Sequence, residues 1–163
     1  MFKKLACFMI LIVFVTSLSN VRLMLSHSVM SLAIIRVPED YSTIQAAVNA
    51  ASSGDIILVA PDVYYENVVV NKSVRIVGEN SINTVVEGAG GFLDTILVSA
   101  DYVEITGLTV RNGRAGIWLN HSNHSNIHGN ILTENTYWAG IVLLYSNENT
   151  ITSNTAVNME GEI

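Results

Sequence analysis

The sequence predicts an all-β solenoid, in which short parallel strands stack coil upon coil behind one helix. Short β-branched runs follow one another from about residue 56 and are broken by Gly, Asn, Asp or Pro. An internal repeat with a period near 23 residues covers the second half of the chain. The strands lie too close together in sequence for crossover helices, which excludes a doubly wound α/β sheet.

The helix is expected at about residues 42–52. Ser42 and Gln45 fit a capping box, in which the Ser42 side chain accepts from the amide three residues on while the Gln45 side chain reaches back to the Ser42 amide. Apolar residues then recur at helical spacing, at Ile44, Ala47, Val48 and Ala51. Gly54 provides a stop signal. The expected strands after it are 56–59, 68–70, 74–77, 84–86 and 96–98.

Three markers define the repeat. Ile105 recurs as Ile127 and Ile151, Gly116-Ile117-Trp118-Leu119 recurs as Gly140-Ile141-Val142-Leu143, and Asn112 recurs as Asn135 and Asn158. One repeat is too small to bury a face alone, so we expect stacked coils about 4.8 Å apart with Ile117 directly against Ile141. The Asn residues suit left-handed turns and can hydrogen-bond along a column. A leucine-rich repeat is excluded because its Leu signature and its helix in each repeat are missing.

Composition limits the function. A chain of 163 residues with 50% hydrophobic and 13% charged residues is one folded domain and not a disordered chain. Beyond residue 22, five basic residues face all 14 acidic ones, so nucleic acid is an improbable partner. Cys7 is the single cysteine, which excludes an intrachain disulfide and a zinc–cysteine cluster. We expect no cofactor.

The ends of the chain carry two further expectations. Lys3 and Lys4 precede an apolar run at 5–15, so we expect residues 1–19 to be a signal peptide or an uncleaved anchor, residues 20–36 a junction and residues 37–163 the β-helix domain. The protein would then be extracytoplasmic, with membrane contact through the N-terminal segment. Because Gly161-Glu162-Ile163 matches the start of a repeat strand, we expect a domain incomplete at its C-terminus, or an uncapped end that a partner or a second copy covers.

Four segments carry a family resemblance. They are residues 43–48 (TIQAAV), 54–59 (GDIILV), 64–70 (YYENVVV) and 72–79 (KSVRIVGE). These resemble the opening coils of right-handed parallel β-helices of the pectin lyase-like superfamily, and within it the NosD-like, carbohydrate-binding and sugar-hydrolase-type repeat proteins. The resemblance implies that the helix at 42–52 plugs the N-terminal end of the solenoid. Asp62 stands where such proteins usually have Gly, which predicts a differently shaped turn.

Three histidines lie within eight residues, at His121, His124 and His128. Imidazoles bind copper or zinc, and the NosD resemblance implies an association with copper-enzyme maturation. Two of them fall in turns and His128 points outward from a strand, so the alternative is that all three are simply solvated.

Three glycosylation sequons begin at Asn71, Asn120 and Asn123. A glycan on Asn120 or Asn123 would block the histidines.

Three aromatic residues are candidates for stacking on sugar rings. Alternation directs Trp118 outward, and Tyr137 and Trp138 lie in a nearby loop. The alternative for Trp118 is packing against a neighbouring loop.

The acidic residues do not predict a catalytic site. Asp94, Asp101 and Glu104 lie close in sequence but have no matched Arg or His companion, and Arg111 and Arg114 read as isolated. No residue is therefore assigned a catalytic role. We expect an exported or cell-surface scaffold, non-enzymatic, with polysaccharide or a cell-envelope component as its candidate partner. A truncated remnant of a polysaccharide lyase or hydrolase is the first alternative, and a NosD-type copper-associated extracytoplasmic protein is the second.

Overall fold

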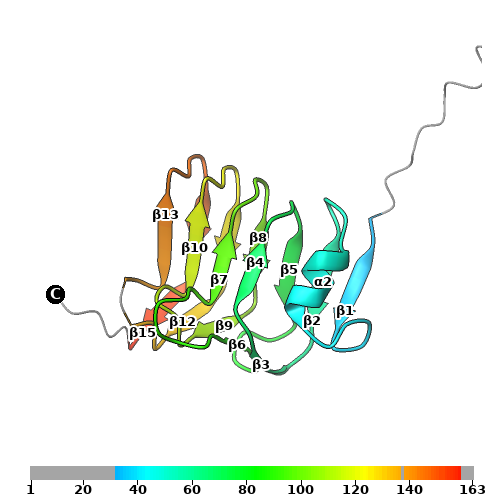
Figure 1. Ribbon diagram of the computed structural model, residues 1–163, viewed down its shortest axis with the longest axis horizontal. Coiled ribbons are helices and arrows are strands. Elements are labelled where there is room, and N and C mark those ends of the chain that lie inside the picture. The colour runs from blue at the N-terminus through cyan, green and yellow to red at the C-terminus, as the bar shows by residue number, and fades with distance from the viewer. Residues whose placement is uncertain (1–31, 137, 159–163) are drawn as a thin grey trace, which may run out of the picture. The chain divides into compact units, whose positions relative to one another are not determined.

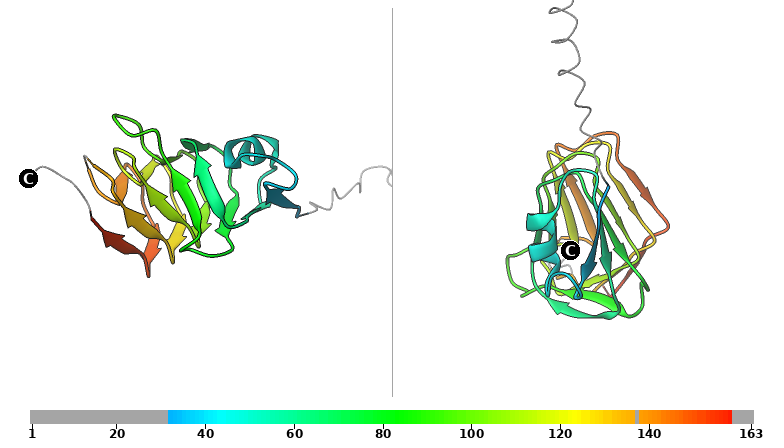
Figure 2. Two further views of the ribbon diagram at one scale, coloured as in Figure 1. Left: turned by 90° about the horizontal axis from the view of Figure 1, so that it is seen from below. Right: turned by 90° about the vertical axis from the view of Figure 1, so that its right-hand side faces the viewer.

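The described part of the chain is a parallel β-helix. The computed structural model describes residues 32–136 and 138–158, so the predicted signal segment and Tyr137 lie outside the described residues. Three parallel sheets run along the solenoid (Figure 1; Figure 2, right). None of the helices among the described residues has the length and apolar character needed to cross a membrane.

The first sheet, sheet A, consists in order of β1 (Ile34–Val37), β2 (Ile56–Val59), β5 (Arg75–Gly78), β8 (Glu104–Thr106), β11 (Asn126–His128) and β14 (Thr150–Thr152). The second, sheet B, consists of β3 (Asp62–Tyr65), β6 (Thr84–Glu87), β9 (Thr109–Arg111), β12 (Ile131–Thr133) and β15 (Thr155–Val157). The third, sheet C, consists of β4 (Val68–Val70), β7 (Ile96–Val98), β10 (Ile117–Asn120) and β13 (Ile141–Leu144).

The predicted stacking is confirmed. Ile105, Ile127 and Ile151 are direct partners on successive strands of sheet A, and Ile117 pairs with Ile141 on sheet C. Ile117 is fully buried and Ile141 packs against the same core. The strands are too short to bury a face alone, so the aliphatic interior exists only because each coil covers the next.

The helix α2 spans Ile44–Ala50 and lies against β4, where it takes the place of a strand (Figure 1). The predicted cap is shifted by one residue, because Thr43 and not Ser42 is the N-cap. The Gln45 side chain does not reach back to Ser42. It accepts from Val69 N at 2.7 Å and donates to Val69 O at 3.3 Å, so its amide pairs with the β4 edge as a neighbouring strand would. The helix therefore caps the edge of sheet C.

Both ends of α2 are bound by side chains of the following coil. The Glu66 carboxylate accepts from the Ile44 and Gln45 amides at 2.8 and 2.9 Å. At the other end, Lys72 Nζ donates to the carbonyls of Asn49 and Ala51 at 2.6 and 2.7 Å. The acid at the helix start and the base at its end both match the direction of the helix dipole.

The strands that the sequence pattern does not predict are β1, β3, β9, β12 and β15. β1 covers the last three residues of the predicted junction 20–36 together with Val37, so the stacked strands begin at Ile34. The buried Asp55 carboxylate holds the chain in place just before β1, because it accepts hydrogen bonds from Ala33 N at 2.9 Å and from Ser52 N at 2.8 Å. Asp62 begins β3 and pairs with Thr84, so it lies in a strand and not in a left-handed turn.

Asparagine side chains bind successive coils at the turns. Asn130 Oδ1 accepts from Leu108 N at 3.1 Å, while its Nδ2 donates to Ile105 O at 2.9 Å and to Asn154 Oδ1 at 3.0 Å. Asn130 and Asn154 thus form a column of asparagines that bond to each other, at positions other than the three expected ones. The sequence pattern predicts that Asn112, Asn135 and Asn158 occupy the same position in successive repeats. This is wrong for Asn135, because the residue in that position is its neighbour Glu134. The left-handed turn residues there are Asn112, Glu134 and Asn158, and Asn135 instead accepts from Gly113 N.

Candidate groove on sheet C

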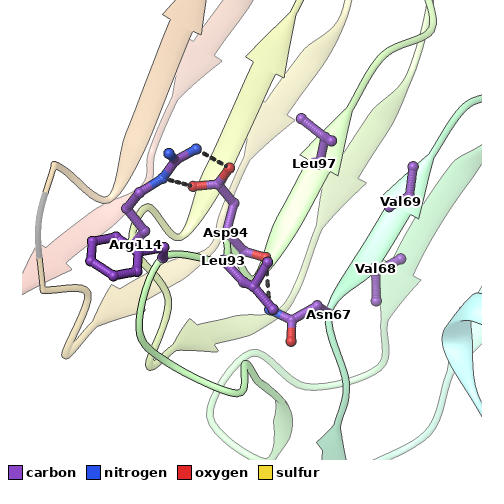
Figure 3. Close-up of a pocket in the computed structure, with 8 residues that line it drawn as sticks. Asn67, Val68, Val69, Leu93, Asp94, Leu97 and Arg114 are labelled. Atoms are coloured by element: carbon purple, nitrogen blue, oxygen red, sulfur yellow. Dashed lines mark hydrogen bonds and ion pairs between the residues drawn. The ribbon is translucent and has the colours of Figure 1, made fainter.

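A shallow groove of about 200 Å³ lies where the loops enter sheet C. Its described lining residues are Asn67, Val68, Val69, Phe92, Leu93, Asp94, Leu97 and Arg114. Figure 3 shows Asp94 and Arg114 facing each other beside Leu93, with Leu97 and Val69 on the neighbouring strands. The groove is therefore apolar, with one charged pair at its side.

The apolar surface continues across the outer face of sheet C. Val69, Leu97, Trp118 and Val142 are in register on successive strands. On β4, β7 and β10 their neighbours along the strand point inward and are buried, as period-two alternation requires, whereas on β13 Ile141 is partly buried and Leu143 is exposed. The result is a continuous row of outward apolar side chains at right angles to the strands.

The charged pair is a two-point interaction between neighbouring loops. Arg114 Nε lies 3.0 Å from Asp94 Oδ1, and Arg114 Nη2 lies 2.8 Å from Asp94 Oδ2. Ala115 N also donates to Asp94 Oδ1, and Asn67 Nδ2 donates to the Asp94 carbonyl. The hydrogen bond that Arg114 donates to Asp94 raises the pKa of Arg114, partly opposed by burial. The pair therefore brings one acidic and one basic side chain together at the side of the groove.

Arg114 also lies against the rings of two tryptophans, Trp118 and Trp138. Its guanidinium carbon lies 4.6 Å from the centre of the Trp118 ring and 5.9 Å from that of Trp138, and the two rings are 5.2 Å apart at 59°. Trp118 points outward as predicted, but it is only 8% exposed because it packs against the loop that carries Trp138. Trp138 is 59% exposed and offers the accessible aromatic surface.

The three histidines have separate partners. His121 lies beside Asn120 and the Tyr145 ring, and His124 stacks on Tyr102 at 4.9 Å and pairs with Glu148. His128 points outward from β11, as predicted, and contacts Glu104 at 3.2 Å and Thr106 at 3.3 Å. Within residues 32–136 and 138–158, no three His, Cys, Asp or Glu side chains are arranged to hold a metal ion.

The prediction that the arginines are isolated is wrong. Arg111 pairs with Glu87 at 2.6 Å, in addition to the Arg114–Asp94 pair. Glu104, expected to have no companion, binds Arg75 at 2.6 Å as well as His128. The hydrogen bond from Arg75 is the main cause that lowers the pKa of Glu104.

The repeat register is the signal that could have revealed two of these pairs. The partners Arg111 and Glu87 occupy the same position on adjacent coils, as do Arg75 and Glu104. The coil from Arg75 to Glu104 spans 29 residues, however, whereas later coils span 22 or 24. A fixed period of 23 therefore misses that pair.

The three sequons differ in their surroundings. Asn71 is exposed on the turn between β4 and β5. Asn120 ends β10 and lies beside His121. Asn123 is hydrogen-bonded to both adjacent coils, through Asp101 and Asn147.

Comparison with known proteins identifies the family and the fold. Residues 48–163 match the family described as periplasmic copper-binding protein (NosD). A cell surface glycoprotein from Methanothermus fervidus is 30% identical over 104 residues, which are 63% of this chain and 16% of that protein.

Two groups of solved structures share the fold. An alginate lyase from Paenibacillus sp. str. FPU-7 has a TM-score of 0.56 at 24% identity, covering 75% of this chain and 44% of its own. A pectin methylesterase in complex with a hexasaccharide has a TM-score of 0.63 at 15% identity, covering 77% and 48%. The chain thus spans about half the length of these structures, and the likeness shows the fold alone.

The family description includes copper, and the described residues do not fit a copper ion. The three clustered histidines face different partners, two of them carboxylates. Copper would need several imidazole or sulfur ligands converging on one point. The coil register, the family match over residues 48–163 and the cell-surface relative lead to one conclusion: the chain belongs to the NosD family, as an extracytoplasmic parallel β-helix protein.

Proposed function

We propose that the protein is a non-enzymatic surface scaffold that binds polysaccharide in the groove over sheet C. The observation that carries this proposal is the exposed Trp138 ring beside an apolar groove with a fixed Arg114–Asp94 pair. A pyranose has an apolar C–H face and a rim of hydroxyls. An indole can cover the face, while the guanidinium and carboxylate serve the hydroxyls as donor and acceptor.

The charge of the groove favours neutral sugars. Arg114 and Asp94 neutralise each other, and the chain as a whole carries a formal net charge of −6. The structures that share the fold are an alginate lyase and a pectin methylesterase, named for alginate and pectin. A polyuronate would meet repulsion from this acidic protein without a free cation in the described groove lining to offset it.

The groove supports binding better than cleavage. Glycoside hydrolysis by the common route uses two carboxyl groups set about 5 to 10 Å apart. Asp94 is the one carboxyl among the described lining residues, and its oxygens are engaged by Arg114 and the Ala115 amide.

Affinity electrophoresis and calorimetry with neutral glucans and mannans, alongside alginate and polygalacturonate, test the proposal. We expect binding of a neutral polymer, weakened at least tenfold by Trp138→Ala. Tyr102→Ala is the matched control, because Tyr102 is also exposed but lies on the turn before β8. Binding that does not depend on Trp138, or a stronger affinity for the polyuronates, would contradict the proposal. Release of reducing ends or unsaturated products would favour the enzyme alternative.

A further inference from the structure

The structure separates the three sequons into one modification site and two structural elements. We propose that Asn71 carries an N-linked glycan in the folded protein, and that Asn120 and Asn123 remain unmodified because their sequons are built into the contacts between coils. Before folding, all three sequons satisfy the acceptor pattern Asn-x-Ser. After folding, the contacts around each asparagine determine whether it can carry a glycan.

Asn71 is suited to carry a glycan. Its side chain is exposed, and neither its amide nor the Ser73 hydroxyl takes part in a hydrogen bond among the described residues. The backbone around it is fixed by other groups: Lys72 holds the end of α2, and the Ser73 carbonyl accepts from Gly54 N at 2.6 Å. A glycan on Asn71 would therefore extend into solvent without removing any contact of the solenoid.

Asn123 is in the opposite situation. Its Oδ1 accepts from Asn147 N on the next coil at 2.8 Å, and its Nδ2 lies 3.2 Å from Asp101 Oδ1 on the previous coil. Asp101 also accepts from Asn123 N at 2.7 Å. Stacked coils are about 4.8 Å apart, so a sugar on Nδ2 would have to lie between them. Modification at Asn123 would break this column.

The hydroxyl groups of both inner sequons are buried. Ser122, the third residue of the Asn120 sequon, is 0% exposed and its hydroxyl donates to Ala100 O at 2.7 Å. Ser125, the third residue of the Asn123 sequon, is also buried and its Oγ accepts from Val103 N at 3.0 Å. In the folded chain neither hydroxyl is available to an enzyme, whereas Ser73 is partly exposed.

The modification is a glycosyl transfer. Nδ2 of Asn71 forms a bond to C1 of the first sugar of an oligosaccharide linked to a polyprenyl phosphate or diphosphate. The bond between C1 and the phosphate oxygen breaks, and the lipid phosphate leaves with the electron pair. The proton lost from Nδ2 is taken up by solvent or the leaving phosphate. An oligosaccharyltransferase of the host supplies the donor and the catalysis, and no oxidant or reductant is needed.

The test is expression of the full chain in a host that glycosylates secreted proteins, followed by glycopeptide mass spectrometry of the folded fraction. We expect one glycan, on Asn71, lost in both Asn71→Gln and Ser73→Ala and retained in Ser73→Thr. The unglycosylated Asn71→Gln chain should keep the wild-type unfolding temperature.

Asn123→Gln and Asn123→Asp are the structural counterparts. Asn123→Gln should lower the unfolding temperature by several degrees without changing the glycan mass. Asn123→Asp removes the same sequon and keeps an acceptor for Asn147 N, but it sets a second carboxylate against Asp101, so it should lower the unfolding temperature at least as much as Asn123→Gln. A glycan on Asn120 or Asn123 in the folded fraction would overturn the inference. So would the absence of any glycan while a control sequon in the same host is occupied.

Discussion

Replacing Asn130 by Ala should destabilise the solenoid strongly, although it removes only a small polar side chain. Asn130 is 1% exposed and joins three coils through Leu108 N, Ile105 O and Asn154 Oδ1. The change leaves a buried amide and a buried carbonyl without these partners. Each such group costs about 1–3 kcal/mol, so the free energy of unfolding should fall by about 2–6 kcal/mol.

The measurement is equilibrium urea unfolding followed by the fluorescence of Trp118 and Trp138, with calorimetry as a second probe. Asn83→Ala is the matched control, because Asn83 is exposed and its side chain makes no hydrogen bond among the described residues. That variant should stay within about 0.5 kcal/mol of wild type. If Asn130→Ala unfolds at the same urea concentration as Asn83→Ala, the side-chain column does not hold the coils together and the reasoning is wrong.

Three further predictions follow from the packing. Ile117→Asp places a charge in a fully buried site and should cost several kcal/mol, whereas Ile117→Val should cost about 1 kcal/mol; equal melting temperatures would contradict the register. The hydrogen bonds from Ala33 N and then Ser52 N lower the pKa of Asp55, so its stabilising contribution is present above the unfolded value of about 4 and is lost as pH falls through the lower folded value. Asp55→Asn should therefore reduce the slope of melting temperature against pH in the acid range, and an unchanged slope would count against this role. Lys72→Met should free the C-terminal end of α2 and lower stability by about 1–3 kcal/mol, with faster amide exchange in the helix as the specific readout.

The interior of the fold is predictable from the sequence because one physical rule determines it. Period-two alternation and a repeat near 23 residues place Ile105, Ile127 and Ile117 correctly, since each must be buried by its neighbouring coil. β1 is missed because Ile34 and Ile35 fall in residues 20–36, which the sequence pattern predicts to be a junction. The helix cap shifts by one residue because Gln45 finds a long-range partner, Val69, that a local rule does not include.

The surface site is less predictable because its contacts depend on coils of unequal length. Arg114 and Asp94 are separated by 20 residues and meet through loops, so no periodic alignment pairs them. Alternation correctly sends Trp118 outward but says nothing about the loop that covers it. Which of the two tryptophans stays exposed depends on the path of the loop that carries Trp138, and the sequence pattern does not reveal this path.

The side-chain bonds between coils also determine how the protein should respond to force. Each strand pairs only with the strands above and below it, and the Asn130 and Asn123 columns add bonds between the same neighbours. Pulling the two ends of the described solenoid apart along its axis would load one coil boundary at a time. Rupture should then proceed as a series of small steps of about one repeat, not as a single event. If the protein serves as the surface scaffold that we propose, such stepwise extension would dissipate mechanical load while the remaining coils stay folded.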